Sequence, residues 1–316
     1  MDKPLLQVKD LKKYFDTPAG SLHAVDGVSF DIQKGRTLGV VGESGCGKST
    51  LGRTILNLLP ATAGEVYFKG QKVTGAGRKE MKALRREMQL IFQDPYASLN
   101  PRMTTSQAIA HPLKVNGQLK GKAAVEEKVD ELMDTVGLAP RYAYAYPHEL
   151  DGGRRQRIGI ARALALNPDF IVCDEPVSAL DVSIQAQILN LLMDLQDQRG
   201  LTYMFITHNL SVVKHISDDI AVMYLGQCVE KTNSRELFKN PLHPYTKALL
   251  DAIPVPVLRE GARKRRAIAG ELVSPINPPA GCRFAPRCPR ACEACTCQDI
   301  PLKEVSPSHF VKCVLF

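Results

Sequence analysis

The sequence lacks any apolar run that approaches the roughly 18–20 residues a membrane-spanning helix needs. Its start, MDKPLLQVKD, has no apolar stretch of the kind found in secretory signals, so nothing suggests export. We therefore expect a protein that is made and kept in the cytosol. The composition lacks a strong bias as well: 44% of the residues are hydrophobic and 23% are charged. These values exclude a disordered or a fibrous chain and indicate a soluble globular one.

The chain is basic, with 41 lysines and arginines against 33 aspartates and glutamates and a formal net charge of +8. A nucleic-acid or anionic-membrane partner fits this value, and so does an ordinary basic surface. With 316 residues the chain can bury a core and hold more than one domain.

Strands and helices alternate along the sequence. LQVKDLKKYF and AVDGVSFDI have strand-like apolar spacing, and RTLGVVG is a short buried strand that runs into a glycine-rich turn. Apolar residues recur at helical spacing from Val125 to Val136, with Gly137 as a stop, and we expect a basic helix beyond Gly153. The strand DFIVCDE, the helix SIQAQILNLLMDLQDQRG and the strand TYMFITH follow. This order predicts an α/β core with a mainly parallel sheet.

The composition changes from about residue 270, where GELVSPINPPAGC is too rich in proline and glycine for a helix. We place the boundary of a C-terminal appendage between residues 237 and 270. Six of the nine cysteines lie in the last 35 residues. In a cytosolic protein such a cluster points to a metal or cluster site more than to disulfides. The six are Cys282, Cys288, Cys292, Cys295, Cys297 and Cys313.

The segment GESGCGKST, from Gly42 to Thr50, fits the pattern G-x-x-x-x-G-K-S/T between a strand and an apolar helix. Its three glycines, Gly42, Gly45 and Gly47, let the backbone curl until successive N–H groups face phosphates. The N-terminus of the helix that follows adds partial positive charge. The segment therefore predicts a phosphate-binding loop.

The side chains of this loop suit a nucleotide with a metal ion. Lys48 supplies a mobile charge to the outer phosphates, and the Ser49 hydroxyl is suited to Mg²⁺. Cys46 points to no redox chemistry and is most simply a small filler. The loop is completed by Glu43, Ser44 and Thr50.

Acidic residues end the later strand FIVCDE. Asp174 is suited to orient a metal-bound water, and Glu175 to polarise the water that attacks a γ-phosphate. His208 follows FIT at the carboxyl end of the next strand, where α/β sheets hold ligands. We predict that it acts at the same site.

These motifs and their order resemble the ATP-binding subunits of ABC transporters over nearly the whole chain. Walker A is GESGCGKST, the Q-loop is IFQDPYASLNP with Gln93, and the signature region is ELDGGRRQR. Walker B is FIVCDE, the D-loop is SALD and the switch is His208. QDPYASLNPRM, DEPVSALDVSIQAQ, NPLHPYTKALL and GCRFAPRCP are similar to the dipeptide/oligopeptide importer branch, nearest to the F-type ATPase subunits of dipeptide permeases.

The resemblance implies an α/β P-loop NTPase fold of the ABC ATPase type, with an antiparallel β subdomain, a helical subdomain and a small Cys-rich C-terminal appendage. Residues 1–240 would form the nucleotide-binding domain, with the helical subdomain at about 95–165. Residues 241–316 would form the C-terminal region of oligopeptide and dipeptide transporters.

The resemblance also implies the assembly and its activity. MgATP hydrolysis would energise import of dipeptides or oligopeptides from the cytoplasmic face of the cell membrane. The chain would pair with a second, paralogous ATPase and two membrane subunits, and indirectly with an extracytoplasmic binding protein. A nickel or glutathione-like cargo stays open, because this branch shares the same C-terminal signature. A nucleic-acid-associated ABC ATPase is disfavoured by the single Walker A, the lack of an internal repeat and the lack of a long coiled-coil insertion.

Further roles follow from the resemblance. Gln93 would contact Mg²⁺ and sense the membrane subunits. Phe15, or as second choice Tyr14, would stack on adenine. Signature residues Asp151, Gly152 and Gly153 would cover ATP held by the partner ATPase, and Asp181 of the D-loop would lie beside the nucleotide. Cys282, Cys288, Cys295 and Cys313 match the spacing of a reported 4Fe–4S site, with Zn²⁺ as the alternative and Cys292 and Cys297 as extra thiols.

Two residues depart from the family pattern Leu-Ser-Gly-Gly-Gln: Asp151 replaces the serine and Arg154 the glutamine. Both Ser and Asp are good N-caps, so the change is locally mild. An ionised carboxylate about 4 Å from a phosphate charge is, however, opposed by about 4 kcal/mol at an effective dielectric of 20. Arg154 at i,i+3 could neutralise Asp151. Our hypothesis is that the composite site using Asp151 turns over poorly, while the site built on this chain's own Walker A hydrolyses ATP.

Overall fold

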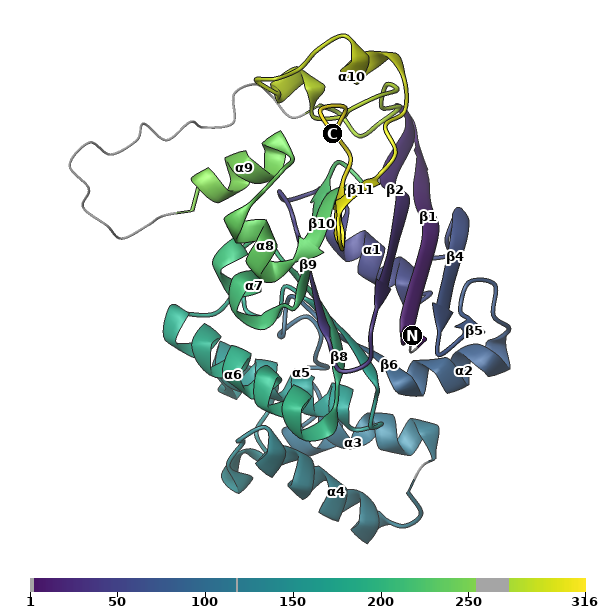
Figure 1. Cartoon of the computed structure of the whole chain (residues 1–316). Coiled ribbons are helices and arrows are strands. Elements are labelled where there is room, and N and C mark those ends of the chain that lie inside the picture. The colour runs from purple at the N-terminus through teal and green to yellow at the C-terminus, as the bar shows by residue number, and fades with distance from the viewer. Residues whose placement is uncertain (1–2, 118, 254–272) are drawn as a thin grey trace, which may run out of the picture. The chain divides into compact units, whose positions relative to one another are not determined.

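The computed structural model describes residues 3–117, 119–253 and 273–316 (Figure 1). The chain divides into two compact units. The first holds Met1–Gln33, Thr37–Gly75 and Thr207–Phe316, and the second holds Lys34–Arg36 and Ala76–Ile206.

The first unit contains an antiparallel sheet in the order β2-β1-β4-β5. Its strands are β1 (Leu6–Thr17), β2 (Gly20–Ile32), β4 (Ala63–Phe68) and β5 (Gln71–Lys72). Along β1, Leu6, Val8 and Leu11 are buried, because alternate side chains of a strand share one face. β1 and β2 form a hairpin in which Thr17 pairs with Gly20 and Tyr14 pairs with His23. The expected antiparallel β subdomain is confirmed.

A second set of strands in this unit has the order β11-β12-β10-β9-β3. They are β3 (Thr37–Val41), β9 (Asp219–Tyr224), β10 (Gln227–Asn233), β11 (Lys303–Ser306) and β12 (His309–Val311). β3 and β9 are parallel and buried along almost their whole length, as the continuous apolar run in RTLGVVG predicts. The helices of the unit are α1 (Lys48–Ile55), α7 (Leu210–Ile216), α8 (Ser234–Lys239), α9 (Pro244–Asp251), α10 (Ala294–Cys297) and the 3₁₀ turn η3 (Ala285–Arg287).

The C-terminal segment, yellow in Figure 1, covers the ends of β1, β2 and β10. β12 pairs with β10, and Leu22 of β2 forms a bridge with Ile276. Tyr224, Tyr245 and Phe284 are fully buried and pack together, with ring centroids 4.6–5.3 Å apart. The appendage therefore shares a hydrophobic core with the strands of the first unit.

The second unit has parallel strands in the order β8-β7-β6, namely β6 (Met88–Ile91), β7 (Phe170–Asp174) and β8 (Thr202–Thr207). Its helices are α2 (Arg78–Glu87), α3 (Thr105–Asn116), α4 (Lys122–Thr135), α5 (Gly152–Leu164), α6 (Val182–Arg199), η1 (Pro140–Tyr142) and η2 (Pro147–Glu149). The helices predicted at 125–136, beyond 153 and at 183–200 are confirmed as α4, α5 and α6.

The predicted α/β fold is confirmed, and described residues 273–281 contain no helix, as their proline and glycine content suggests. The helical subdomain at about 95–165 and the boundary near residue 240 stay predictions. Part of the boundary region, residues 254–272, lies outside the described residues.

Candidate functional site

The loop from Gly42 to Thr50 connects β3 to α1 and is closed by Lys48. The Lys48 side chain is buried, and its ammonium donates hydrogen bonds to the carbonyl oxygens of Gly42 at 2.8 Å and Glu43 at 2.9 Å. A cation is thus held at the centre of the loop by two neutral acceptors. Negatively charged phosphate oxygens are stronger partners for an ammonium than these carbonyls.

Two glycines of this loop have no room for a side chain. Gly47 has φ 100°, and a Cβ atom there would lie 1.9 Å from the Ala24 carbonyl oxygen of β2. A Cβ on Gly42 would lie 2.1 Å from the Met223 carbonyl oxygen and 2.7 Å from the Cys46 sulfur. The backbone of the loop is therefore packed directly against β2 and the end of β9.

The third predicted glycine, Gly45, is in a different situation. It is exposed with φ 78°, and nothing lies within 4 Å of a Cβ placed there. A side chain would therefore fit at this position, and glycine is favoured there only because the backbone is left-handed. The neighbouring Cys46 is buried, and burial raises the pKa of its thiol. This agrees with the prediction that Cys46 is a filler.

The loop is also held from the C-terminal side of the chain. The Glu43 backbone N–H donates to the hydroxyl of buried Tyr245 at 2.9 Å. The Glu43 carboxylate pairs with the Arg287 guanidinium, with Nη1–Oε2 at 3.0 Å. Tyr245 lies on α9 and Arg287 in η3, about 200 and 240 residues downstream. Ser44 is exposed, and Ser49 and Thr50 lie half-buried in the first turn of α1.

The second unit brings two predicted residues together. Asp174 ends β7 and is buried, and Glu175 follows it with φ 47°. Gln93 follows β6, and its Nε2 donates to Glu175 Oε2 at 2.9 Å. The Glu175 N–H donates to the Ile206 carbonyl oxygen at 2.9 Å, which fixes the backbone in this left-handed conformation. Backbone strain of this kind costs about 1–3 kcal/mol and clusters at functional sites.

The signature segment begins α5. Asp151 is its N-cap, and Oδ1 accepts from the Arg154 N–H at 2.8 Å. Asp151 Oδ2 also pairs with the Arg154 guanidinium, which stacks over the Tyr142 ring at 4.7 Å. Gly152 lies in the first turn, and a Cβ on Gly153 would lie 2.7 Å from an Ile184 methyl group. The Asp151–Arg154 pair that the spacing suggested is present.

The remaining predicted residues have clear positions. Asp181 is the exposed N-cap of α6, and His208 is exposed just after β8. Tyr14 and Phe15 are adjacent on β1. The Tyr14 ring stacks on His23 with centroids 3.9 Å apart, and its hydroxyl donates to Asp26. Phe15 lies under the Lys13 ammonium, 4.7 Å from the ring centroid.

Comparisons with known proteins agree with this architecture. The family profile "ABC transporter" matches residues 25–178, and the profile "Oligopeptide/dipeptide transporter, C-terminal region" matches residues 229–295. The oligopeptide transport ATP-binding protein AppF of Bacillus subtilis is 52% identical over 321 residues, covering 99% of this chain and 97% of its own length. The B. subtilis protein OppF, which has the same description, is 59% identical over 257 residues, covering 81% of this chain and 84% of its own. This chain is an ATP-binding subunit of the oligopeptide/dipeptide ABC transporter family.

Solved structures support the fold of this ABC ATPase. The dimeric ATP-binding cassette MJ0796 bound to ADP and phosphate has a TM-score of 0.67 and 29% identity, covering 73% of this chain and 99% of that one. CbiO1 from Clostridium perfringens, part of a cbiONQ transporter complex, has a TM-score of 0.67 and 26% identity, covering 76% and 92%. Among the described residues of the ABC ATPase, no helix has the length and hydropathy to cross a membrane.

Sequence reasoning about the ABC ATPase missed the residues that join its C-terminal region to the phosphate loop. Arg287 stands between the cysteines of GCRFAPRCP, and Tyr245 stands in NPLHPYTKALL. Both segments were singled out as family signatures, but nothing in their spacing indicated a contact with Glu43.

The four predicted cluster ligands of the ABC ATPase, Cys282, Cys288, Cys295 and Cys313, line one small cavity together with His243. A four-thiol donor set suits Fe–S or Zn²⁺ chemistry. Burial raises the pKa of the Cys282 thiol to about 11 and also raises the pKa values of the other three. In the described parts of the chain, however, no group of three or more potential ligands is arranged to hold a metal ion. The donor chemistry fits a cluster, whereas the side-chain arrangement does not.

Proposed function

We propose that this chain binds MgATP in the Gly42–Thr50 loop, closes against a second, unlike ATPase, and hydrolyses ATP to energise import of dipeptides or oligopeptides. The observation that supports this most strongly is the hydrogen bond from Gln93 to Glu175. It joins the carboxylate suited to activate water with the residue that resembles a sensor of membrane subunits.

Binding depends first on Lys48. Its ammonium exchanges the carbonyl oxygens of Gly42 and Glu43 for the outer phosphates of ATP, while the loop N–H groups face the remaining oxygens. Mg²⁺ neutralises phosphate charge in such sites, and Ser49, Asp174 and Gln93 are the residues that would hold it. Phe15 is the proposed adenine partner, because the Tyr14 ring is already stacked on His23.

Hydrolysis depends on Glu175, which takes a proton from the attacking water, and on His208, which orients the γ-phosphate. In the structure described, the Gln93 amide occupies one oxygen of the Glu175 carboxylate. Movement of Gln93 by the membrane subunits frees that oxygen for water, so that turnover is tied to transport. In this proposal the chain is a peripheral subunit at the cytoplasmic face of the cell membrane, and an extracytoplasmic binding protein selects the cargo.

The two composite ATP sites differ in this proposal. Glu175, His208 and Lys48 are all present for the site on this chain's own Walker A. The other site uses Asp151. Its carboxylate would repel the phosphates of the partner's ATP, and the positive charge of Arg154 would offset only part of this repulsion. The second site therefore binds ATP and turns it over slowly.

We also propose a metal site on the four thiols that line one cavity; because they are not arranged as a ligand group in the structure described, metal binding would require these side chains to turn toward a common centre. Its role would be to fasten a proline-rich tail. Iron and zinc analysis of protein purified without oxygen tests it, with Cys282→Ser and Cys313→Ser expected to lose the metal. Cys297→Ser, at an exposed position, is the matched control and should keep the metal. If the wild-type protein contains no bound metal, the metal site is refuted.

The function is tested by Glu175→Gln in the assembled transporter. ATP binding should be retained, because Lys48 and the loop are untouched, while turnover and peptide uptake fall by about 10²–10⁴-fold with loss of the base. Glu127→Gln, on the exposed face of α4, is the control. Normal peptide uptake with Glu175→Gln would contradict the mechanism. Uptake of nickel or a glutathione-like compound in place of peptides would instead change the cargo.

A further inference from the structure

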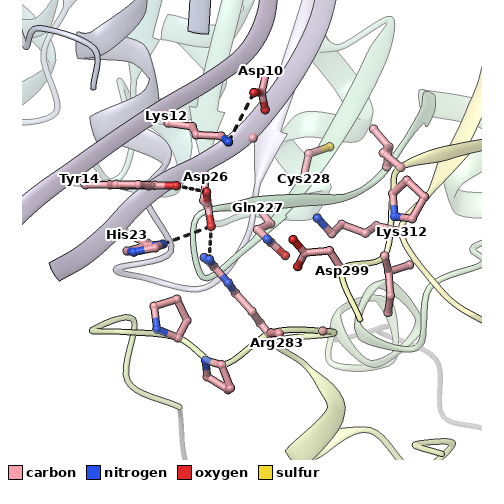
Figure 2. Close-up of a pocket in the computed structure, with 18 residues that line it drawn as sticks. Asp10, Lys12, Tyr14, His23, Asp26, Gln227, Cys228, Arg283, Asp299 and Lys312 are labelled. Carbon is pink, nitrogen blue, oxygen red and sulfur yellow. Dashed lines mark hydrogen bonds and ion pairs between the residues drawn. The ribbon is translucent and has the colours of Figure 1, made fainter. Parts of the chain in front are cut away.

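A cavity of about 600 Å³ lies in the first unit, away from the phosphate loop residues (Figure 2). Its walls come from β1, β2, the start of β10, and the C-terminal segments around Arg283, Asp299 and Lys312. The volume lies within the range of small-molecule sites, which is about 300–1,000 Å³. Six of its 18 lining residues carry charged side chains, more than is usual for such sites: Asp10, Lys12, Asp26, Arg283, Asp299 and Lys312.

One side of the cavity is locked by its own hydrogen bonds. Asp26 accepts from the Tyr14 hydroxyl, pairs with the Arg283 guanidinium, and lies 3.3 Å from His23 Nδ1. Figure 2 shows these three partners converging on the one carboxylate. This network has no charge left over for a ligand and acts as a rigid wall.

The other side is different. Figure 2 shows the Lys312 ammonium and the Asp299 carboxylate directed toward the same part of the cavity, with no interaction drawn between them. Within the described residues, neither side chain forms a hydrogen bond or an ion pair. Burial lowers the pKa of Lys312, and the charge of Asp299 opposes this shift. Lys312 and Asp299 thus present opposite charges to the same cavity and lie near each other without forming an ion pair.

Two neighbouring charges of opposite sign are complementary to a ligand that carries the same two charges in reverse. We propose that the cavity binds a small zwitterion, an amino acid or short peptide, whose carboxylate pairs with Lys312 and whose ammonium pairs with Asp299. A simple anion would leave Asp299 unpaired, and a simple cation would leave Lys312 unpaired.

The cavity wall is connected to the phosphate loop through the turn between β9 and β10. Arg283 donates to the Leu225 carbonyl oxygen, and the next residue, Gly226, donates its N–H to the Cys46 carbonyl oxygen at 2.9 Å. The Asp26 N–H donates to the Gly226 carbonyl oxygen at 2.8 Å. The turn is also packed closely against β2, because a Cβ on Gly226 would lie 2.5 Å from the His23 carbonyl oxygen. An occupant of the cavity therefore changes ATP affinity; this second part rests on the proposed function.

Calorimetry on the purified full chain tests the site, with alanine, dialanine and a dialanine blocked by acetyl and amide groups as probes. Alanine or dialanine should bind and the blocked peptide should not, since it lacks both charges. Lys312→Met keeps the apolar stem and should weaken binding by more than about tenfold, the value of a charged hydrogen bond. Lys303→Met, on exposed β11, is the matched control and should bind normally.

The affinity for a fluorescent ATP analogue is then measured with and without the better zwitterion. A shift in the wild type that disappears in Lys312→Met supports the coupling. Equal binding of the blocked peptide, or no binding of either zwitterion up to about 10 mM, overturns the site. If ATP binds but no zwitterion does, this proposal fails while the proposed function stands. If ATP itself does not bind, the proposed function fails.

Discussion

The charges at the start of α5 predict that substitutions of Asp151 and of Arg154 change ATP-dependent closure of the two ATPases in opposite directions. In the proposed closed pair, Asp151 would lie about 4 Å from a phosphate charge of the partner's ATP, which would oppose closure by about 4 kcal/mol at a dielectric of 20. Arg154 pairs with the second oxygen of Asp151. A positive charge about 7 Å from the same phosphate would contribute about 2 kcal/mol in favour. The remaining cost is about 2 kcal/mol, or about twentyfold in closure.

The ion pair between Asp151 and Arg154 adds little to this estimate of the cost of closure. The Asp151 and Arg154 side chains are 56% and 41% exposed, and exposed ion pairs contribute only about 0–1 kcal/mol. Solvent screening also reduces both phosphate terms, so we expect changes of about tenfold and not the full Coulomb values. Asp151→Ser should tighten ATP-dependent closure by about tenfold, and Arg154→Gln should weaken it by a similar factor.

The assay is the ATP concentration for half-maximal closure of the assembled transporter, followed by energy transfer between labels on the two ATPases. Asp197→Ser, at an exposed position of α6, is the control for loss of an acidic residue. If both substitutions at the signature shift closure in the same direction, or by no more than the control, the electrostatic reasoning is refuted. Turnover measured in parallel shows whether the second site limits the cycle.

Two further predictions concern the first unit. Tyr245→Phe leaves the Glu43 N–H without its acceptor at a cost of about 1–3 kcal/mol; ATP affinity should fall about tenfold, whereas Tyr67→Phe on the surface should leave it unchanged. Burial opposes ionisation of Asp26, but the bonds from Tyr14 and His23 and the charge of Arg283 lower its pKa. A lowered folded pKa stabilises the protein above the unfolded value of about 3.9 and loses this effect as pH falls. Asp26→Asn should therefore lower the melting temperature at neutral pH, with a gap to the wild type that narrows below about pH 4; a gap constant with pH would contradict this.

The parts of the site that the sequence predicted are those carried by local pattern. The phosphate loop needs glycine at 42 and 47, because the backbone there has positive φ and lies against the carbonyl oxygens of other strands. Such a requirement can be recognised in the sequence, because only glycine meets it. Asp151 is the N-cap of α5, which agrees with the sequence argument that Asp and Ser are both good N-caps at this position.

Contacts between distant segments could not be predicted in the same way. Gln93 and Glu175 are 82 residues apart, and only the parallel pairing of β6 with β7 brings the ends of their strands together. The end of the strand FIVCDE indicated Glu175 and the family resemblance indicated Gln93, but neither gave a sign of the hydrogen bond. Likewise, nothing in the sequence indicates that Lys312 and Asp299 line one cavity, because nothing in it shows that the tail folds over β1, β2 and β10.

Glu43 shows why such contacts escape a motif. It occupies one of the four positions that G-x-x-x-x-G-K-S/T leaves open, since the phosphate-binding pattern does not depend on its side chain. That freedom lets the side chain serve the C-terminal region, through Arg287, without cost to ATP chemistry. The motif accepts any residue at position 43, whereas the contact with Arg287, 244 positions away, requires an acidic side chain there.

The pair can be tested by exchanging its two residues. Glu43→Arg or Arg287→Glu alone should reduce ATP affinity, and the double variant should restore it. Failure of this rescue would mean that the pair does not position the loop.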